Sequence, residues 1–229
     1  MFVSAIVVAA GLGKRFNKGR ISKAVLRLRG RPLVFYALNI LNKHPLISEI
    51  ILVGNADNRD ALRNIVKEYK IRKVSNIVLG GKERKDSVLQ GIRDSSSKSD
   101  LILIHDGVRP FINARLLTSV IKAAHKAGAA VLGIPVKSTI KRADRNGFVE
   151  TTLDRHRLWE IQTPQVFAKK LILTAFKKFG EIMATDDSML VERLGKKIKI
   201  ISGSYDNIKI TTPEDMYVAE GIVKRCRCA

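Results

Sequence analysis

The feature that most constrains this chain is a short apolar run that ends in a glycine-rich turn. Residues 4–9 are small or β-branched and lack helical spacing, which is typical of a buried strand in a parallel sheet. Gly11 and Gly13 follow. A backbone without a Cβ can turn tightly at these positions and bring its amide groups close to a phosphate. The run therefore predicts a strand that leads into an anion-binding loop.

Basic residues follow this turn at high density. Amide donors combined with fixed positive charge are what a polyphosphate site requires. Two well-known glycine motifs do not fit, because Phe16 stands where the Rossmann fingerprint has its third glycine and no Gly-Lys-Ser/Thr follows as in a P-loop. A solvated basic loop is the alternative interpretation. Eight of the eighteen residues from 14 to 31 are basic: Lys14, Arg15, Lys18, Arg20, Lys23, Arg27, Arg29 and Arg31.

The composition is that of a globular protein, with 229 residues, 45% of them hydrophobic and 28% charged. No apolar run approaches the length of a membrane span and no signal peptide is evident, so we expect a cytoplasmic protein. Cys226 and Cys228 are too few and too close together for a disulfide framework or a four-ligand zinc site. We expect both cysteines to be reduced and incidental.

The formal net charge of +21 raises the possibility of nucleic-acid or membrane-surface binding. Its distribution argues against both, because Lys and Arg number 15, 13 and 14 in residues 1–76, 77–153 and 154–229. An even spread indicates a generally basic surface rather than a stripe or a tail. We therefore expect neither a nucleic-acid nor a membrane partner.

Apolar spacing predicts strands and helices in alternation over the first 134 residues. This order implies right-handed crossovers, a mainly parallel sheet with helices on both faces, and ligands at the carboxyl ends of the strands, where the Gly11 loop and Asp106 lie. After the first strand, the expected strands are 49–53, 76–79, 101–105 and 129–134, and the expected helices are one opened by Pro32 at position N1 and others at 59–69, 85–94, 113–127.

Residues 136–155 break this alternation. They predict a hairpin around an Asn146-Gly147 turn, and a two-stranded ribbon is marginal alone, so it must lie on something. Beyond it we expect a helix over 168–179, another that starts at 185–187, an edge strand over 196–202 and a final helix capped by residues 212–215. The chain is predicted to be one domain, 1–229, with an arm at about 136–155.

Several segments, in their order and spacing, resemble the 2-C-methyl-D-erythritol 4-phosphate cytidylyltransferases of the non-mevalonate isoprenoid pathway. Each segment is weak evidence alone, but together they are highly specific. They are Ala9-Ala-Gly-Leu-Gly-Lys-Arg15, Gly80-Gly-Lys-Glu-Arg84, Asp86-Ser-Val88, His105-Asp106, Arg109-Pro-Phe111, Asp154-Arg155, Leu158-Trp159, Gln162-Thr-Pro-Gln165, Thr185-Asp-Asp187 and Asn207-Ile-Lys-Ile-Thr211.

The resemblance implies a single Rossmann-like, GT-A-like nucleotidyltransferase domain. It also implies attack by the phosphate of methylerythritol phosphate on the α-phosphorus of CTP, with pyrophosphate as the leaving group. A phosphate monoester dianion is already a competent nucleophile, so the protein must position two anions and stabilise charge rather than supply a base. Mg2+ or another divalent cation is the implied cofactor, with Asp106 as its ligand and Asp206 as a second candidate.

The same resemblance assigns roles to individual residues. Arg15, Lys23, Arg155 and Lys209 would be catalytic. Ala9, Ala10, Gly11, Gly13, Gly81, Arg84, Ser87, Asp106 and Gly107 would bind the nucleotide. Arg109, Thr139, Arg155, Thr163, Asp206 and Lys209 would bind the sugar phosphate. The family is a homodimer whose arm embraces the partner, so Thr139 and Arg155 would serve the neighbouring site, while Trp159 would pack at the arm or interface. His105 is expected in the core or behind the site.

Two departures from the family pattern keep alternatives open. The family usually has proline before the loop lysine, whereas Ser22 precedes Lys23 here, so Arg20 is a candidate for the same role. Gly107-Val108 replaces the common Ala-Ala, and valine there is also seen in ribitol-5-phosphate cytidylyltransferases. The alternatives to a methylerythritol-phosphate enzyme are therefore a ribitol-phosphate enzyme and, in another class, a non-catalytic basic protein that binds RNA or anionic membrane.

Overall fold

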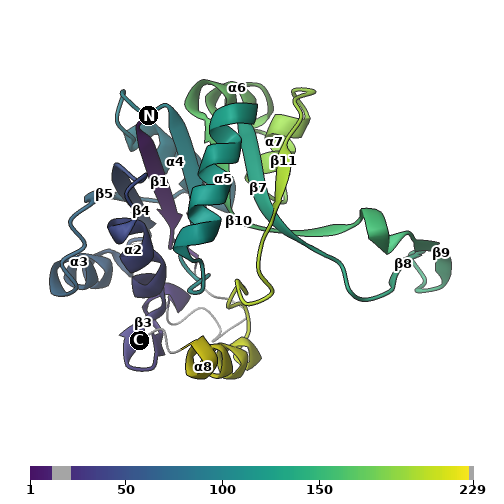
Figure 1. Cartoon of the computed structure of the whole chain (residues 1–229), viewed down its shortest axis with the longest axis horizontal. Helices are drawn as coiled ribbons and strands as arrows, with labels where there is room; N and C mark the ends of the chain where they lie inside the picture. Colours follow the sequence, from purple (N-terminus) through teal and green to yellow (C-terminus); the bar gives the residue numbers. More distant parts are fainter. Residues whose placement is uncertain (12–21, 227–229) are drawn as a thin grey trace.

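A seven-stranded sheet forms the centre of the computed structural model, which describes residues 1–11 and 22–226 (Figure 1). Every pair of neighbouring strands is parallel except those that involve β10, which runs antiparallel to β6 and β7. The predicted α/β class and mainly parallel sheet are thus confirmed. The strand order is β11 (Lys199–Ser202), β7 (Ala129–Pro135), β10 (Trp159–Ala168), β6 (Leu101–Asp106), β1 (Val3–Val8), β4 (Glu49–Gly54) and β5 (Val74–Leu79).

Helices cover both faces of the sheet, as predicted. Successive side chains of β1 point to opposite faces, so Ala5 and Val7 join one core and Ile6 joins the other. The first core is closed by α2 (Leu33–Lys43), α3 (Arg59–Glu68) and α5 (Ala114–Ala127), and the second by α4 (Arg84–Asp94), α6 (Lys169–Phe179) and α7 (Asp187–Glu192). Pro32 precedes α2 at the N-cap, one position earlier than predicted.

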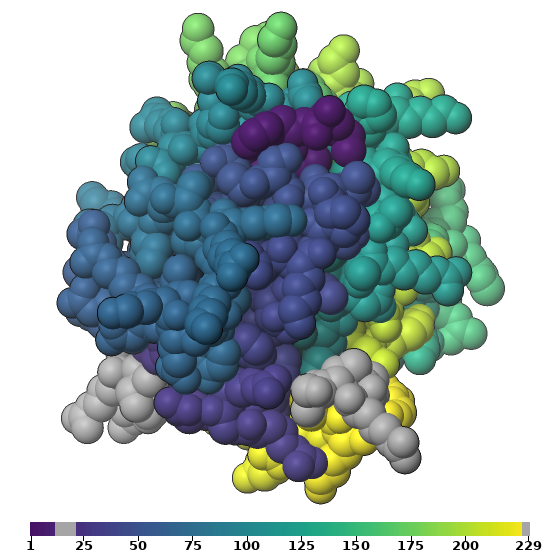
Figure 2. Space-filling view, turned by 60° about the vertical axis from the view of Figure 1, so that its left-hand side comes forward, coloured from purple at the N-terminus to yellow at the C-terminus, as the bar shows by residue number. Residues whose placement is uncertain are grey.

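A third, smaller apolar cluster lies below the sheet. The short strand β2 (Arg27–Leu28), paired with β3 (Arg31–Pro32), packs there against the final helix α8 (Glu214–Cys226). The cluster joins Leu28 of β2, Leu33 of α2, Ile210 and Ala219 of α8. Figure 2 shows α8 in yellow against the violet segment that carries these strands. This packing brings the single 3-10 turn η1 (Lys23–Val25) close to Thr211, whose carbonyl accepts from Lys23 Nζ at 3.5 Å.

The strand β10 was missed by the sequence prediction, which gave residues 162–165 no element. Pro164 lies inside it, and proline is normally excluded from a strand between two neighbours. The Thr163-Pro164 bond is cis, and the pairing with β7 shifts in register between Gln162 and Gln165. This register shift interrupts the regular pairing at the position where proline lies.

The predicted hairpin is present and projects from the body of the molecule (Figure 1). It consists of β8 (Ile140–Ala143) and β9 (Val149–Leu153), followed by the 3-10 turn η2 (Arg155–Arg157). Its turn is centred one residue earlier than predicted, because Gly147 N donates to the Asp144 carbonyl at 3.2 Å, and Gly147 follows with a φ of +87°. Phe148 and Val149 at the tip are 72% and 60% exposed. In the described ranges no helix is long and apolar enough to cross a bilayer.

Candidate active site

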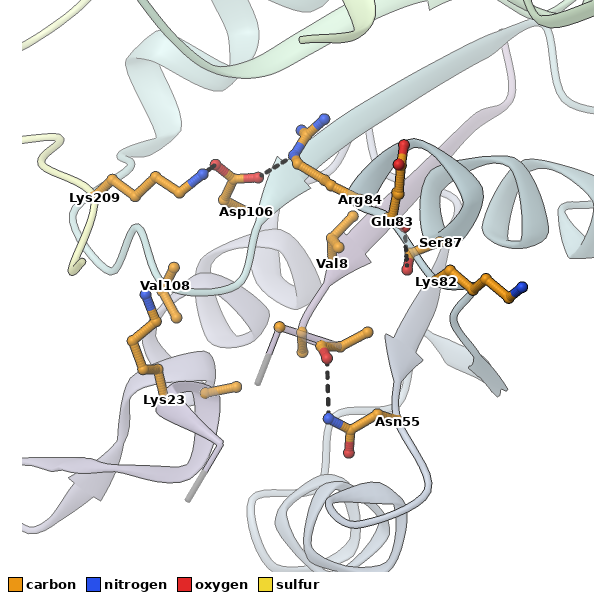
Figure 3. A pocket seen from close by; sticks show the side chains of 15 residues that line it. Val8, Lys23, Asn55, Lys82, Glu83, Arg84, Ser87, Asp106, Val108 and Lys209 are labelled. Atoms are coloured by element: carbon orange, nitrogen blue, oxygen red, sulfur yellow. Dashed lines mark hydrogen bonds and ion pairs between the residues drawn. The ribbon is translucent and has the colours of Figure 1, made fainter. Parts of the chain in front are cut away.

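A cavity of about 550 Å³ opens at the carboxyl ends of β1, β4 and β6, where the sequence predicted a ligand site (Figure 3). The strand-end placement follows from the parallel sheet. Its walls come from six separate segments and include Gly11 and Gly81. The lining residues are Val8, Ala9, Ala10, Gly11, Lys23, Ala24, Asn55, Gly81, Lys82, Glu83, Arg84, Ser87, Asp106, Val108 and Lys209.

Asp106 is the central charge of this site. It ends β6, is only 5% exposed, and has Lys209 Nζ 2.7 Å from one carboxylate oxygen and Arg84 Nε 3.1 Å from the other. Arg109 Nε lies 3.7 Å away, which permits an ion pair but not a hydrogen bond. Burial alone would raise the pKa of Asp106, but the charges of Arg84 and Lys209 outweigh it and hold that pKa far below its usual range. Asp106 is therefore ionised.

Arg84 is held by a second carboxylate, Asp187, which the sequence analysis placed at the start of a helix and in a family segment without giving it a role in the site. Its Nη1 donates to Asp187 at 2.8 Å, and Asp187 is 1% exposed at the start of α7. Burial raises the pKa of Asp187, and the charge of Arg84 opposes that rise. The cap itself is Asp186, which accepts from Met189 N at 3.0 Å. The doubled aspartate was the available signal, since a helix needs only one N-cap.

A hydrogen-bond chain fixes the backbone of Asp106. Its N–H donates to Thr163 Oγ1 at 3.0 Å. The His105 Nε2–H donates to the Arg109 carbonyl at 3.2 Å, which can only accept and so fixes the ring proton on Nε2 and leaves Nδ1 of the neutral ring as the acceptor. The Thr163 hydroxyl therefore donates to His105 Nδ1 at 3.1 Å. His105 is fully buried, and burial lowers its pKa from 6.5 to about 4. A neutral imidazole agrees with this chain, and the expectation of a core histidine is confirmed.

Gly80, in the turn directly after β5, permits close packing between this turn, Ala10 and Ser87. A Cβ at this position would lie 2.8 Å from the Cβ of Ala10 and closer still to Ser87 Oγ. The exits of β5 and β1 can therefore approach each other only with glycine there. Glu83 and Asp86 form a capping box that starts α4 and presents Arg84 to the cavity.

The predicted site residues fall into four groups. The cavity brings together the residues Ala9, Ala10, Gly11, Lys23, Gly81, Arg84, Ser87, Asp106 and Lys209. Arg109 adjoins Asp106 through charge and Thr163 through a hydrogen bond. Gly107 follows Asp106 in the chain, and its N–H donates to the Val8 carbonyl at 2.9 Å. Gly13, Arg15 and the alternative Arg20 lie outside the described residues.

Three predicted residues do not reach this cavity within one chain. Asp206 forms an ion pair with Arg225. Thr139 lies on the arm segment and is exposed, and Arg155 donates from the arm to the Lys137 carbonyl at 2.9 Å. In Figure 1 the arm extends away from the strand ends that surround the cavity. Asn55 lines the cavity and was not predicted, because its role depends on the fold of the β4–α3 turn.

Comparison with known proteins identifies the family. The sequence model of the family described as 2-C-methyl-D-erythritol 4-phosphate cytidylyltransferase matches residues 3–225. The chain belongs to this family. The cytidylyltransferase of Caldanaerobacter subterraneus subsp. tengcongensis is 43% identical over 228 residues, 98% of this chain and 100% of that protein. The Geobacillus kaustophilus cytidylyltransferase is 44% identical and covers 97% of each chain.

Solved structures agree with the cytidylyltransferase assignment. The crystal structure of 4-diphosphocytidyl-2C-methyl-D-erythritol synthase from Anaerococcus prevotii matches with a TM-score of 0.87 and 35% identity, over 98% of this chain and 96% of that one. The Thermus thermophilus cytidylyltransferase has a TM-score of 0.79 and 27% identity over 98% and 100%. The predicted family and the prediction of a nucleotidyltransferase are confirmed, and methylerythritol phosphate is favoured over ribitol phosphate.

Proposed function

We propose that this chain transfers the cytidylyl group of CTP to 2-C-methyl-D-erythritol 4-phosphate, forming 4-diphosphocytidyl-2-C-methyl-D-erythritol and pyrophosphate in isoprenoid precursor synthesis. The observation that carries the proposal is the strand-end cavity, where one buried carboxylate is surrounded by Arg84, Arg109 and Lys209. Cations converging on one point suit two anionic reactants. Family membership supplies the identity of both reactants.

In the proposed reaction, a phosphate oxygen of the sugar phosphate forms a bond to the α-phosphorus of CTP, and the bond from that phosphorus to the bridging oxygen of pyrophosphate breaks. Lys23 and Lys209 approach the cavity from the same side, and Arg84 approaches from the opposite side (Figure 3). We assign Lys23, with Arg15, to the charge on the triphosphate and Lys209 to the sugar phosphate. Their charges oppose repulsion between the reactants and stabilise the transition state.

Asp106 is the group we assign to Mg2+. In the described part of the chain, no three His, Cys, Asp or Glu side chains lie together as a metal site. The single carboxylate of Asp106 fits Mg2+, which binds through one or two carboxylates plus substrate phosphates and retained waters. When bound, the ion would neutralise part of the triphosphate charge. Arg84 and Lys209 hold the two carboxylate oxygens, so either cation must share or release its oxygen when the metal binds.

The arm supports a proposal of a homodimer. Phe148 and Val149 expose apolar surface at its tip, and β8 and β9 form a sheet of their own. A marginal ribbon of this kind gains stability by lying on a second subunit. We propose that Thr139 and Arg155 complete the partner's site. We also propose a cytoplasmic location for the protein.

A pyrophosphate-release assay tests the function. Purified protein is incubated with Mg2+, one nucleoside triphosphate and either methylerythritol 4-phosphate or ribitol 5-phosphate. We expect turnover with CTP and methylerythritol phosphate, and a loss of about 100-fold or more in rate for Arg15→Met with CTP still bound. Equal or faster turnover of ribitol phosphate would contradict the proposed substrate. No turnover, together with steeply salt-dependent RNA binding, would favour the basic binding protein.

A further inference from the structure

Asn58 occupies the N-cap position of α3, but its side chain does not cap that helix. The comparison within the molecule is Asn113, the N-cap of α5, whose side chain accepts from Leu116 N at 2.9 Å in the ordinary way. Asn58 instead turns its carboxamide toward the end of β1. Asn58 and Asn55 exchange side-chain to backbone hydrogen bonds as in a capping box, which leaves the Asn58 amide nitrogen to bond outside the helix.

The Asn58 carboxamide is fully engaged and 2% exposed. Its nitrogen donates to the Ala9 carbonyl at 2.9 Å and to Ser22 Oγ at 2.8 Å, and its oxygen accepts from Asn55 N at 2.8 Å. Both donors and the acceptor are therefore satisfied. One nitrogen atom thus joins two segments that are distant in the sequence.

Asn55 strengthens the same connection. Its side-chain oxygen accepts from Asn58 N at 2.9 Å, and its nitrogen donates to the Ala10 carbonyl at 2.9 Å, an interaction drawn in Figure 3. The two asparagines therefore hold the consecutive carbonyls of Ala9 and Ala10, which line the cavity just before Gly11. We call Asn55 and Asn58 the asparagine clamp.

The other end of the clamp leads to a cavity lysine. The Ser22 carbonyl accepts from Val25 N at 3.1 Å and so begins the turn η1, whose first residue is Lys23. Because Asn58 holds Ser22, it fixes the start of the turn that carries the Lys23 ammonium group. The clamp therefore sets the spacing between the β1 wall and the Lys23 wall.

We propose that Asn58 is a positioning residue for the triphosphate of CTP, acting through Ser22 and Lys23 on one side and the β1 exit on the other. This inference rests on the proposed function, since it needs CTP in this cavity. If the spacing between the two walls is fixed before binding, less free energy is lost in ordering them when the nucleotide binds. The effect of Asn58 should be larger for CTP than for CMP, because Lys23 is assigned to the charge on the triphosphate.

Calorimetric titration of CTP and of CMP into each variant, with Mg2+ present, tests the proposal. Asn58→Ala should weaken CTP binding about tenfold, the effect of losing a buried hydrogen-bonding group, and change CMP binding less than about threefold. Ser22→Ala should weaken CTP binding in the same direction and by less. In a Lys23→Ala background, Asn58→Ala should have little further effect, because coupled residues are not additive.

Asn113→Ala is the matched control. It should lower the melting temperature through loss of a helix cap and leave both affinities unchanged. The proposal is overturned if Asn58→Ala binds CTP like wild type, or if its effect is the same with and without Lys23. Should Asn58→Ala not fold, Ser22→Ala with unchanged CTP affinity overturns it equally. Failure of the wild-type protein to bind CTP would instead reject the proposed function, on which the inference depends.

Discussion

Asp106 and Asp187 hold one guanidinium group between them, although Asp106 ends strand β6 and Asp187 begins helix α7. Arg84 donates through Nε to Asp106 at 3.1 Å and through Nη1 to Asp187 at 2.8 Å. Asp106 faces the cavity, whereas Asp187 is buried at the start of α7. The pair therefore links the reaction site to the stability of the fold.

Arg84→Met should destabilise the protein by about 3 kcal/mol, because it leaves Asp187 buried without its cation. The measurement is urea unfolding at pH 7, followed by circular dichroism. Arg63→Met is the control, since Arg63 pairs with Asp60 on the surface and the loss should not exceed about 0.5 kcal/mol. Equal losses for the two variants would mean that the buried pair has no special role.

Lys209→Met should lower kcat/KM about 100-fold or more, because it removes the ammonium group assigned to the attacking phosphate. Steady-state pyrophosphate release, with each substrate varied in turn, measures the effect. The defect should appear in kcat and in the KM for the sugar phosphate. Lys199→Met, at an exposed position on β11, should behave as wild type. A change confined to the KM for CTP would refute the assigned role.

Folding stability should depend on pH through His105. The unfolded chain takes up a proton near pH 6.5, whereas burial lowers the pKa of His105 to about 4 in the folded chain. The contribution of neutral His105 to the free energy of unfolding is complete above pH 6.5 and is lost as the pH falls toward 4. From pH 7 to 4.5, wild type should lose about 2 to 3 kcal/mol more than His105→Gln.

Urea unfolding of both proteins at the two pH values checks this prediction. His44, whose pKa burial also lowers, and Asp106 are common to both proteins, so their contributions cancel in the comparison. The glutamine can still accept from Thr163 and donate to the Arg109 carbonyl. Parallel losses in the two proteins would show that His105 is not the source of the pH dependence.

If the arm of one subunit completes the site of the other, two inactive variants should restore activity when they form a mixed dimer. Arg155→Ala and Lys209→Ala should each be inactive alone. After unfolding and refolding together in equal amounts, about a quarter of the sites should combine an intact Lys209 with an intact arm from the other subunit. Pyrophosphate release before and after mixing measures the recovery. No recovery from a mixture that forms heterodimers would place Arg155 in its own subunit's site.

Deletion of residues 140–152 offers a second test of the arm. We expect a monomer without activity, because the deletion removes both the proposed contact with the partner and the support of Arg155. Analytical ultracentrifugation gives the mass, and the same assay gives the activity. An active monomer would refute the shared site.

Local patterns were sufficient to predict most of the fold. Apolar spacing located the helices and most of the strands, because the residues that pack against the sheet recur with the period of their own element. β10 was missed because Pro164 and its polar neighbours interrupt the strand pattern, and pairing with β6 and β7 overrides that local signal. Only the tertiary fold reveals such an element.

The candidate site was predictable where chemistry is concentrated in short motifs, and not where it depends on distant contacts. The Gly11 turn, Arg84, Asp106 and Lys209 were found from motifs and lie around one cavity, although their roles remain predictions. Asp187 meets Arg84 across 103 positions of sequence, and Asn58 meets Ala9 across 49. No local pattern reports such contacts.

The arm leaves and rejoins the sheet at a single point, which has a practical consequence. Pro135 at the end of β7 pairs with Trp159 at the start of β10, and Val136 N donates to the Leu158 carbonyl at 3.1 Å. Everything between these paired positions is an excursion whose length does not alter the register of the strands. Engineers could therefore lengthen, trim or exchange this appendage as a cassette while the catalytic body keeps its shape.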